Sequence, residues 1–526
     1  MPANPSEAVW RSAPLIPALP RTTSLEIYDL RAVSPDVLLS VSTLAGLVNR
    51  SAAKLYGIMS DDDEFWLNEI NSSLAQTRVP VTGDDILEHL LNAYRGNFKG
   101  VILYDPDLPA TLNVATTLAG LRDGIVVSPT RASRLQEAPH GLPVLADLRT
   151  HGWKTSLQAY AWAYKYLLPH CSPDLVAGLD PRIRGYLRSF LVAHRVFTCW
   201  LDPRKIVPSP SAGWLCERGL LKRVLASFAP GTVHLGWFVS EPFGIRLTSQ
   251  AALLTLASDY CTNLEVWSSL PESPPSQKGV PVSLEGREND LDKEEKAKRI
   301  YLSFTMSDGD NLQYCQHRLL QLWRDPARGS LPLGWTISPA LRWVMPALAG
   351  FYQRTATKND ELIAGPSGAA YILPAYFPRT WRAAFLTLTA ESMQAMQLTS
   401  LQILDGESFL SWFSMKFLNA RLQKLFASRL VPHGLRGIFS GGGGIRPSWS
   451  QRSGVLIYQN LGLAAHAGRT LRLIEWAARR TRFLNVYIFA WNMTPSDLQG
   501  VVKQLGDNVC VVTPARLLEL IQREAN

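Results

Sequence analysis

Hydrophobic and polar positions along the chain follow two different periods in turn. Short apolar runs that alternate with period two predict strands, and the segments between them repeat apolar residues every three or four positions, as helices do. In the first 130 residues the predicted strands are 24–30, 53–58, 100–105 and 124–128. Because helical segments separate them, the pattern predicts an α/β domain with a parallel sheet covered by helices.

The middle of the chain, residues 150–227, has mainly helical spacing and bridges two such series. A second series of alternating strands and helices begins near Thr232. Its predicted strands are 233–238, 264–267, 300–306, 333–337, 401–404, 437–439, 455–458, 484–489 and 509–512. About eight strand–helix units of this kind predict a (β/α) barrel, with a doubly wound open sheet as the alternative.

These patterns divide the chain into a tail and two domains. Residues 1–24 are rich in Pro, Ala and Ser and predict a flexible tail. Residues 25–228 form the N-terminal α/β domain with its helical bridge, and residues 229–524 form the C-terminal barrel-like domain. Within the latter, residues 271–296 combine Pro, Ser, Gly and charges, which predicts a flexible insertion.

Composition places the chain among ordinary globular proteins, with 46% hydrophobic and 18% charged residues over 526 positions. The net charge of +9 is spread over short clusters, which favours a solvated surface, and we expect no nucleic-acid partner. Six cysteines without a CxxC pair argue against a disulfide scaffold. No apolar run reaches the length of a membrane span, and the chain begins without a secretory signal pattern, so we expect a cytoplasmic protein without membrane attachment.

The sharpest chemical feature is the turn 307–311, Ser-Asp-Gly-Asp-Asn, which directly follows a predicted strand. Ligands of parallel α/β folds bind beyond the carboxyl ends of strands. In an extended segment Asp308 and Asp310 would point the same way. Such a pair could act as acid and base or, with Asn311, orient a sugar hydroxyl; a hard cation is the one cofactor it could hold. The structural alternative is an Asp-Gly turn that only closes the strand.

Three further acids, Glu241, Asp405 and Glu407, follow other predicted strands. Glycoside hydrolysis needs two carboxyl groups, roughly 5 Å apart for retention and up to about 9.5 Å for inversion. Acids at different strand ends can meet this need across a barrel mouth. For each acid alone, a helix cap or a surface ion pair is an equally good explanation.

Other motifs narrow the chemistry. Trp491 and Asn492 follow the end of a predicted strand, and the tryptophan offers an apolar ring face on which the C–H face of a sugar can stack. The chain contains no HExxH, no HxxxH and no GxSxG, so neither a transition-metal hydrolase nor a serine hydrolase has a sequence signature. The four glycines 441–444 fit no phosphate-binding motif and predict a mobile loop.

The segment 360–374, DELIAGPSGAAYILP, resembles the motif that names the GxGYxYP family, which is described as a family of glycoside hydrolases. The turn 307–311 resembles that family's other strong signature. Further likeness lies in segments 338–341, 347–352 and 491–521, and in 44–50, 64–67 and 100–106 of the domain that usually precedes it. The resemblance spans about residues 25–524. It implies hydrolysis of an oligo- or polysaccharide, with Ser367 and Tyr371 among the residues that bind substrate.

The naming motif departs from the family pattern at two positions. Ala370 stands where the third motif position has Gly, and Leu373 stands where it has its second Tyr. The loss of that phenol keeps a second hypothesis open, a carbohydrate-binding or scaffold protein without catalysis. A third hypothesis is a carbohydrate deacetylase assisted by a cation at Asp308 and Asp310, against which the missing histidine pair counts.

Overall fold

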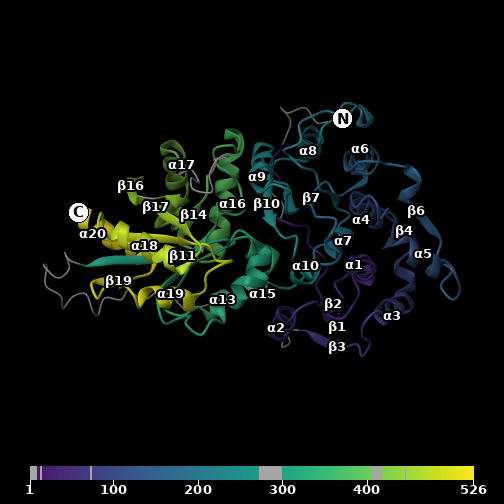
Figure 1. Cartoon of the computed structure of the whole chain (residues 1–526), viewed down its shortest axis with the longest axis horizontal. Helices are drawn as coiled ribbons and strands as arrows, with labels where there is room; N and C mark the ends of the chain where they lie inside the picture. Colours follow the sequence, from purple (N-terminus) through teal and green to yellow (C-terminus); the bar gives the residue numbers. More distant parts are fainter. Residues whose placement is uncertain are drawn as a thin grey trace. The chain divides into compact units, whose positions relative to one another are not determined.

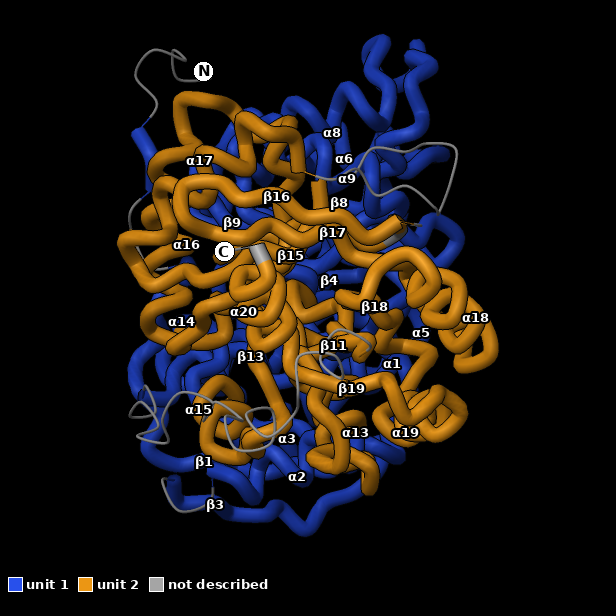
Figure 2. Tube along the Cα trace, turned by 90° about the vertical axis from the view of Figure 1, so that its left-hand side faces the viewer, with its two compact units in different colours: residues 1–272, 343–347 blue, residues 273–342, 348–526 orange. Residues whose placement is uncertain are grey.

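The computed structural model describes residues 9–11, 15–70, 74–271, 299–405, 418–444 and 446–525. The chain divides into two compact units, coloured separately in Figure 2. Unit 1 comprises Met1–Glu272 with Trp343–Ala347, and unit 2 comprises Ser273–Arg342 with Leu348–Asn526. Among the described residues, every helix is too short or too polar to cross a membrane.

Unit 1 is built on three small sheets in which every strand pair is parallel (Figure 1). The sheet orders are β2-β1-β3, β5-β4-β6 and β10-β9-β7-β8. The strands are β1 (Ser24–Asp29), β2 (Leu55–Ile58), β3 (Ala75–Arg78), β4 (Gly100–Leu103), β5 (Gly124–Val127), β6 (Val144–Asp147), β7 (Leu175–Gly178), β8 (Phe197–Cys199), β9 (Val233–Gly236) and β10 (Leu254–Ala257). The predicted parallel α/β architecture of the N-terminal region is confirmed.

Helices connect these strands, as parallel pairing requires. They are α1 (Pro35–Asn49), α2 (Asp61–Glu69), α3 (Asp85–Ala93), α4 (Ala110–Arg122), α5 (Pro129–Gln136), α6 (Ser156–Tyr166), α7 (Arg188–Ala193), α8 (Glu217–Ala226), α9 (Glu241–Gln250) and α10 (Leu264–Trp267). Acidic residues open α2, at the positive end of the helix dipole, and Ser60 and Asp63 form a reciprocal capping box there.

Two elements that the sequence places in the barrel lie in unit 1 instead. Strand β9 pairs with β7, so the predicted domain border at 228/229 falls just ahead of a strand of the unit 1 sheet. Residues 264–267, predicted as a strand, form helix α10. Asn263 directly precedes this helix. Its side chain accepts a hydrogen bond from the N–H of Gly57 (2.8 Å) and donates one to the C=O of Gly57 (2.9 Å), as the backbone of a neighbouring strand would. The four-residue segment Leu-Glu-Val-Trp is too short for its pattern to distinguish a strand from a helix.

Part of the predicted flexible tail packs onto unit 1. Leu15 and Ile16 are buried, and the backbone N–H of Arg11 donates to the carbonyl of Pro230 (2.9 Å). The prediction of a flexible tail is therefore wrong for this part of residues 1–24, because apolar side chains within the Pro-rich segment are buried against the domain. The predicted insertion 271–296 lies, apart from Pro271, outside the described residues.

Unit 2 contains a closed barrel of seven parallel strands in the order β11-β12-β13-β14-β15-β17-β18. The ring closes because β11 pairs with β18 along its length and with β12 at its end. Strand β19 lies beside the start of β11, and β16 pairs antiparallel with β17. The strands are β11 (Ile300–Met306), β12 (Leu333–Ile337), β13 (Asp360–Ala364), β14 (Ser400–Ile403), β15 (Gly437–Gly444), β16 (Ser448–Arg452), β17 (Val455–Ala464), β18 (Phe483–Ile488) and β19 (Val509–Val511). The predicted barrel is confirmed.

The connections between barrel strands are mostly helical (Figure 1). They are α13 (Leu319–Trp323), α14 (Leu341–Val344), α15 (Pro346–Thr355), α16 (Arg382–Ala395), α17 (Ala420–Leu430), α18 (Ala467–Ala478), α19 (Pro495–Val502) and α20 (Pro514–Ala525). A five-residue π-helix, η6 (Tyr314–Arg318), precedes α13. π-Helical turns are rare and occur often at functional sites.

Side-chain hydrogen bonds cross the barrel interior from wall to wall. Ser303 donates to Asn485 (2.6 Å), Asn485 donates to Asn460 (2.8 Å), and Asn460 donates to Gln402 (2.8 Å). Asn460 and Gln402 also both donate to the carbonyl of Gly441 (3.0 Å each). The glycine run 441–444 is thus the end of strand β15 and not the mobile loop that its composition predicts, because buried amides hold its backbone.

Glu361 connects two barrel strands with the last helix at the amino end of the barrel. Its carboxyl accepts hydrogen bonds from Ser400 on β14 (2.9 Å) and from the N–H of Ala515 in α20 (2.7 Å). Burial raises the pKa of Glu361 from 4.5 to about 7. The folded protein therefore keeps this proton at pH values where the unfolded chain has lost it.

We expect Glu361→Gln to remove a part of the pH dependence of stability. The contribution of the protonated carboxyl is complete below pH 4.5 and declines as the pH rises toward 7. The Tm of the wild type should therefore fall, relative to that of the variant, as the pH is raised from 4 to 8. Thermal unfolding of both proteins across this pH range measures the difference in Tm. A difference that stays constant with pH would contradict the prediction.

Candidate active site

The turn 307–311 joins three barrel strands at the carboxyl end of the barrel. The N–H of Ser307 donates to the carbonyl of Ile488 (2.9 Å), and its hydroxyl accepts the N–H of Ala490 (3.2 Å), which fixes the turn to the end of β18. On the other side the N–H of Gly309 donates to Thr336 of β12 (3.0 Å). The turn is therefore held in place from both neighbouring strands.

Asp308 lies at the centre of this turn in the left-handed region, with φ of 73°. A non-glycine residue adopts this conformation only where its surroundings hold it, and such residues gather at functional sites. The extended geometry predicted for the Asp308–Asp310 segment is therefore wrong. Hydrogen bonds from Ser307 and Trp491 reach the carboxyl of Asp308. Although part of the residue is exposed, the surrounding protein raises its pKa by desolvation, which outweighs those bonds.

The other polar residues of the turn start the following π-helix. The amide oxygen of Asn311 accepts the N–H of Tyr314 (3.0 Å), so this side chain caps η6. Asp310 is 8% exposed, and its charge acts on Tyr487 together with that of Asp308. The two aspartates thus share one neighbour even though the backbone between them is not extended.

Tyr314 and Tyr487 are site residues that the sequence did not reveal. Both are fully buried, and both hydroxyls lack a hydrogen-bond partner in the described structure. The charge of Asp308 contributes to raising the pKa of each, after the larger effect of burial. Tyr487 occupies an ordinary position within an apolar strand and Tyr314 one within a helical segment, so no spacing marked them out.

Asp405 and Ser367 lie on a different wall of the barrel. Going around the ring, β12 and β13 separate the Asp308 strand from β14, and three strands separate them on the other side. Ser367 is buried and both donates to and accepts from the backbone of Leu404 (3.0 and 3.1 Å), so it holds the end of β14. The carboxylate of Asp405 accepts the N–H of Ala375 (2.8 Å) and is 6% exposed.

The remaining predicted residues are scattered. Trp491 and Asn492 follow β18 and are exposed, the tryptophan by 40%, and its ring packs edge-on against Tyr314 at 5.7 Å. Tyr371 is buried. Glu241, predicted at the end of a barrel strand, is instead the first residue of α9, because the strand before it, β9, belongs to a sheet of unit 1. Glu407 lies outside the described residues.

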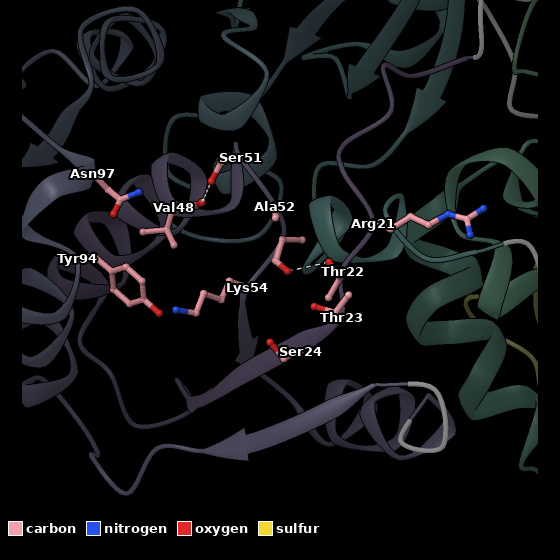
Figure 3. Close-up of a pocket in the computed structure, with 11 residues that line it drawn as sticks. Arg21, Thr22, Thr23, Ser24, Val48, Ser51, Ala52, Lys54, Tyr94 and Asn97 are labelled. Carbon is pink, nitrogen blue, oxygen red and sulfur yellow. Dashed lines mark hydrogen bonds between the residues drawn. The ribbon is translucent and has the colours of Figure 1, made fainter.

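A hollow of about 360 Å³ in unit 1 is large enough for a small ligand, but its position argues against catalysis (Figure 3). It lies where β1 and β2 begin, whereas ligands of parallel sheets bind where strands end. Tyr94 and Lys54 point toward one another across it, and both contact Glu26 (2.6 and 3.2 Å). The charge of Lys54 is therefore already paired within the protein.

In the part of the chain that the structure describes, no three His, Cys, Asp or Glu side chains gather as a metal site would require. The six cysteines, all within the described residues, form no disulfide, and Cys199, Cys261 and Cys315 are buried.

Four domain models of a single family match consecutive parts of the chain. The "GxGYxYP_N 1st domain" matches residues 24–95, the "GxGYxYP_N second domain" 98–171, the "GxGYxYP third domain" 173–269, and the "GxGYxYP putative glycoside hydrolase C-terminal domain" 298–522. The third of these matches contains β7 to β10, in agreement with the sheet that they form.

A solved structure has the same fold. A "putative hydrolase" from Bacteroides thetaiotaomicron VPI-5482 is 21% identical, with a TM-score of 0.78 over 99% of this chain and 98% of its own. A "putative polysaccharide deacetylase" from Mycobacterium smegmatis is 9% identical over 48% of this chain and 96% of its own, and its TM-score of 0.32 is too low for the two sites to be compared. No protein of curated function matches the sequence significantly.

Proposed function

Because the chain belongs to the GxGYxYP family, we propose that it hydrolyses glycosidic bonds of an oligo- or polysaccharide at the carboxyl end of its barrel. One observation supports this most. Asp308 is a carboxyl with a raised pKa, held in a strained turn at the end of a barrel strand, beside an exposed tryptophan. Carboxyls with perturbed pKa values at barrel strand ends are the usual acids of such enzymes.

Asp308 is the general acid of this proposal. A carboxyl whose pKa is raised holds its proton to a higher pH than an ordinary carboxyl does, and can donate it to the oxygen of the leaving sugar as the bond to the anomeric carbon breaks. Desolvation provides this property here. Asp310 in the same turn orients a sugar hydroxyl, and the exposed ring of Trp491 stacks on the C–H face of a sugar.

Asp405 supplies the opposing carboxylate. It follows the end of β14, which lies nearly across the ring from β11, so acid and base reach the scissile bond from two sides. The N–H of Ala375 fixes its orientation, and Ser367 fixes the strand end behind it. The anomeric configuration of the released sugar reports the distance between the two carboxyl groups. Retention requires about 5–5.5 Å between them, and inversion about 6.5–9.5 Å.

We expect the wild type to release reducing sugar from at least one member of a broad glycan panel, and Asp405→Asn to lose about 100-fold or more of this activity. Asparagine keeps the size of the side chain and an oxygen for the N–H of Ala375, so the fold is retained. Product release measured by chromatography, with the anomeric configuration followed by NMR, checks both expectations.

Asp325→Asn is a suitable control, because this acid accepts hydrogen bonds from Ala327 and Ser496 and belongs to no strand end of the barrel. Full activity of Asp405→Asn would remove Asp405 from the reaction. Binding of a glycan without any product, by calorimetry and chromatography on the same sample, would instead favour a carbohydrate-binding protein. The buried Leu373 in the naming motif would then be the first position to restore to Tyr.

A further inference from the structure

Two buried tyrosine hydroxyls next to Asp308 remain unexplained by the proposed reaction. Those of Tyr314 and Tyr487 have lost contact with water and have no hydrogen-bond partner in the described structure. A buried hydroxyl without a partner is destabilising, and native proteins retain few of them. Two such groups around one carboxyl therefore call for a functional explanation.

Both tyrosines belong to elements that frame the turn. Tyr314 begins the π-helix η6, and Tyr487 is the penultimate residue of β18. The charge of Asp308 acts on both hydroxyls, and that of Asp310 acts on Tyr487 as well. The backbone N–H of Asp308 also lies close enough to Tyr487 to favour the ionised phenol, although not in hydrogen-bond geometry.

The demand of Asp308 for hydrogen-bond donors depends on its protonation. An ionised carboxylate accepts up to about four hydrogen bonds, whereas a protonated carboxyl accepts fewer and donates one. Ser307 and Trp491 are the donors present. We propose that Tyr314 and Tyr487 are positioning residues, whose hydroxyls donate hydrogen bonds to the Asp308 carboxylate once it has lost its proton, directly or across one water molecule.

This inference rests on the proposed role of Asp308 as the general acid. In that step the O–H bond of Asp308 breaks, the proton passes to the glycosidic oxygen, and the electron pair stays on the carboxylate. The tyrosines lose no proton; their O–H groups rotate toward the new charge. Donors that engage only as charge develops stabilise the transition state more than the ground state, which is the condition for acceleration.

The surroundings of Asp308 fix the direction of the expected pKa change. The other titratable groups are Asp310 in the turn, Cys315 and Arg318 in η6, and the two tyrosines. Tyr→Phe at 314 or 487 alters none of these other charges. It removes only donors to the ionised form, so the pKa of Asp308 must rise. In an active enzyme the alkaline limb of the pH–rate profile would then move to higher pH.

The test is an infrared titration of the resting full-length protein. The carboxyl band of Asp308 is assigned by subtracting the spectrum of Asp308→Asn and is followed in the wild type, Tyr314→Phe and Tyr487→Phe. We expect the pKa of Asp308 to rise by about one unit in each Phe variant. We also expect an unchanged or higher Tm, because each substitution removes an unpartnered hydroxyl.

Tyr458→Phe is the matched control. Tyr458 is also a fully buried barrel tyrosine, but its hydroxyl donates to the carbonyl of Phe483 (2.9 Å). This variant should lower the Tm and leave the pKa of Asp308 unchanged. An unchanged pKa in both Tyr314→Phe and Tyr487→Phe, or an equal rise in Tyr458→Phe, overturns the inference. Since the titration needs no turnover, it stays readable even when no glycan is cleaved, and the two proposals fail separately.

Discussion

Asparagine in place of Asp308 is expected to lower kcat/KM on a natural glycan by about 10²–10⁴-fold, the range that general acid catalysis contributes. Asparagine has nearly the same shape and keeps an acceptor for Ser307 and Trp491. It cannot give a proton to the leaving group. Because desolvation disfavours the charged form at this position, the variant should be at least as stable as the wild type. Kinetics and thermal unfolding of the same preparation measure the loss of kcat/KM and the stability of the variant.

The choice of substrate separates an acid from the other roles that a carboxyl can have. A glycoside with a nitrophenol leaving group departs without protonation, so Asp308→Asn should hydrolyse it at close to the wild-type rate. A natural glycan with a sugar leaving group should remain nearly uncleaved. If both substrates lost activity equally, Asp308 would be a nucleophile, a base or a structural residue, and the assignment of acid to this position would be wrong.

The fold could be predicted wherever the spacing of apolar residues along the chain shows which positions are buried. Strands of the barrel are buried almost throughout and mostly apolar, since helices cover one side and packed side chains fill the other, and the helices between them carry the longer period. What periodicity cannot report is the sheet to which a strand belongs. Strand β9 has the same character as a barrel strand, yet it pairs with β7, and only the register between them decides this.

The sequence predicted the site residues that lie just after the ends of predicted strands. The turn after β11 and the tryptophan after β18 were both expected, and the structure connects them through Ser307 and Ala490. Tyr314 and Tyr487 were missed because a buried tyrosine within an element ordinarily packs in the core. Their significance lies in a missing hydrogen bond, which is a property of three-dimensional packing alone.

The position of the turn depends on Gly309, and Gly309→Ala is expected to displace it. A Cβ at residue 309 would lie 2.1 Å from the carbonyl carbon of Thr336 and 2.3 Å from the nitrogen of Ile337. These are backbone atoms of a barrel strand and cannot yield as the end of a side chain can, so the turn must move instead. Asp308 and Asp310 flank Gly309 and would move with it. A shift of about 1 Å at a catalytic group lowers activity on the order of 100-fold.

We expect Gly309→Ala to lose this activity together with about 1–3 kcal/mol of the free energy of unfolding, the usual effect of forcing an extra methyl group into packed structure. Urea unfolding and kcat/KM on the glycan that the wild type cleaves measure the two losses. Gly500→Ala provides the control, because residue 500 lies in α19 with no atom near its added Cβ, and alanine favours a helix. Should Gly309→Ala match Gly500→Ala in both stability and rate, the close approach of the turn to β12 would not be what holds Asp308 in its strained conformation.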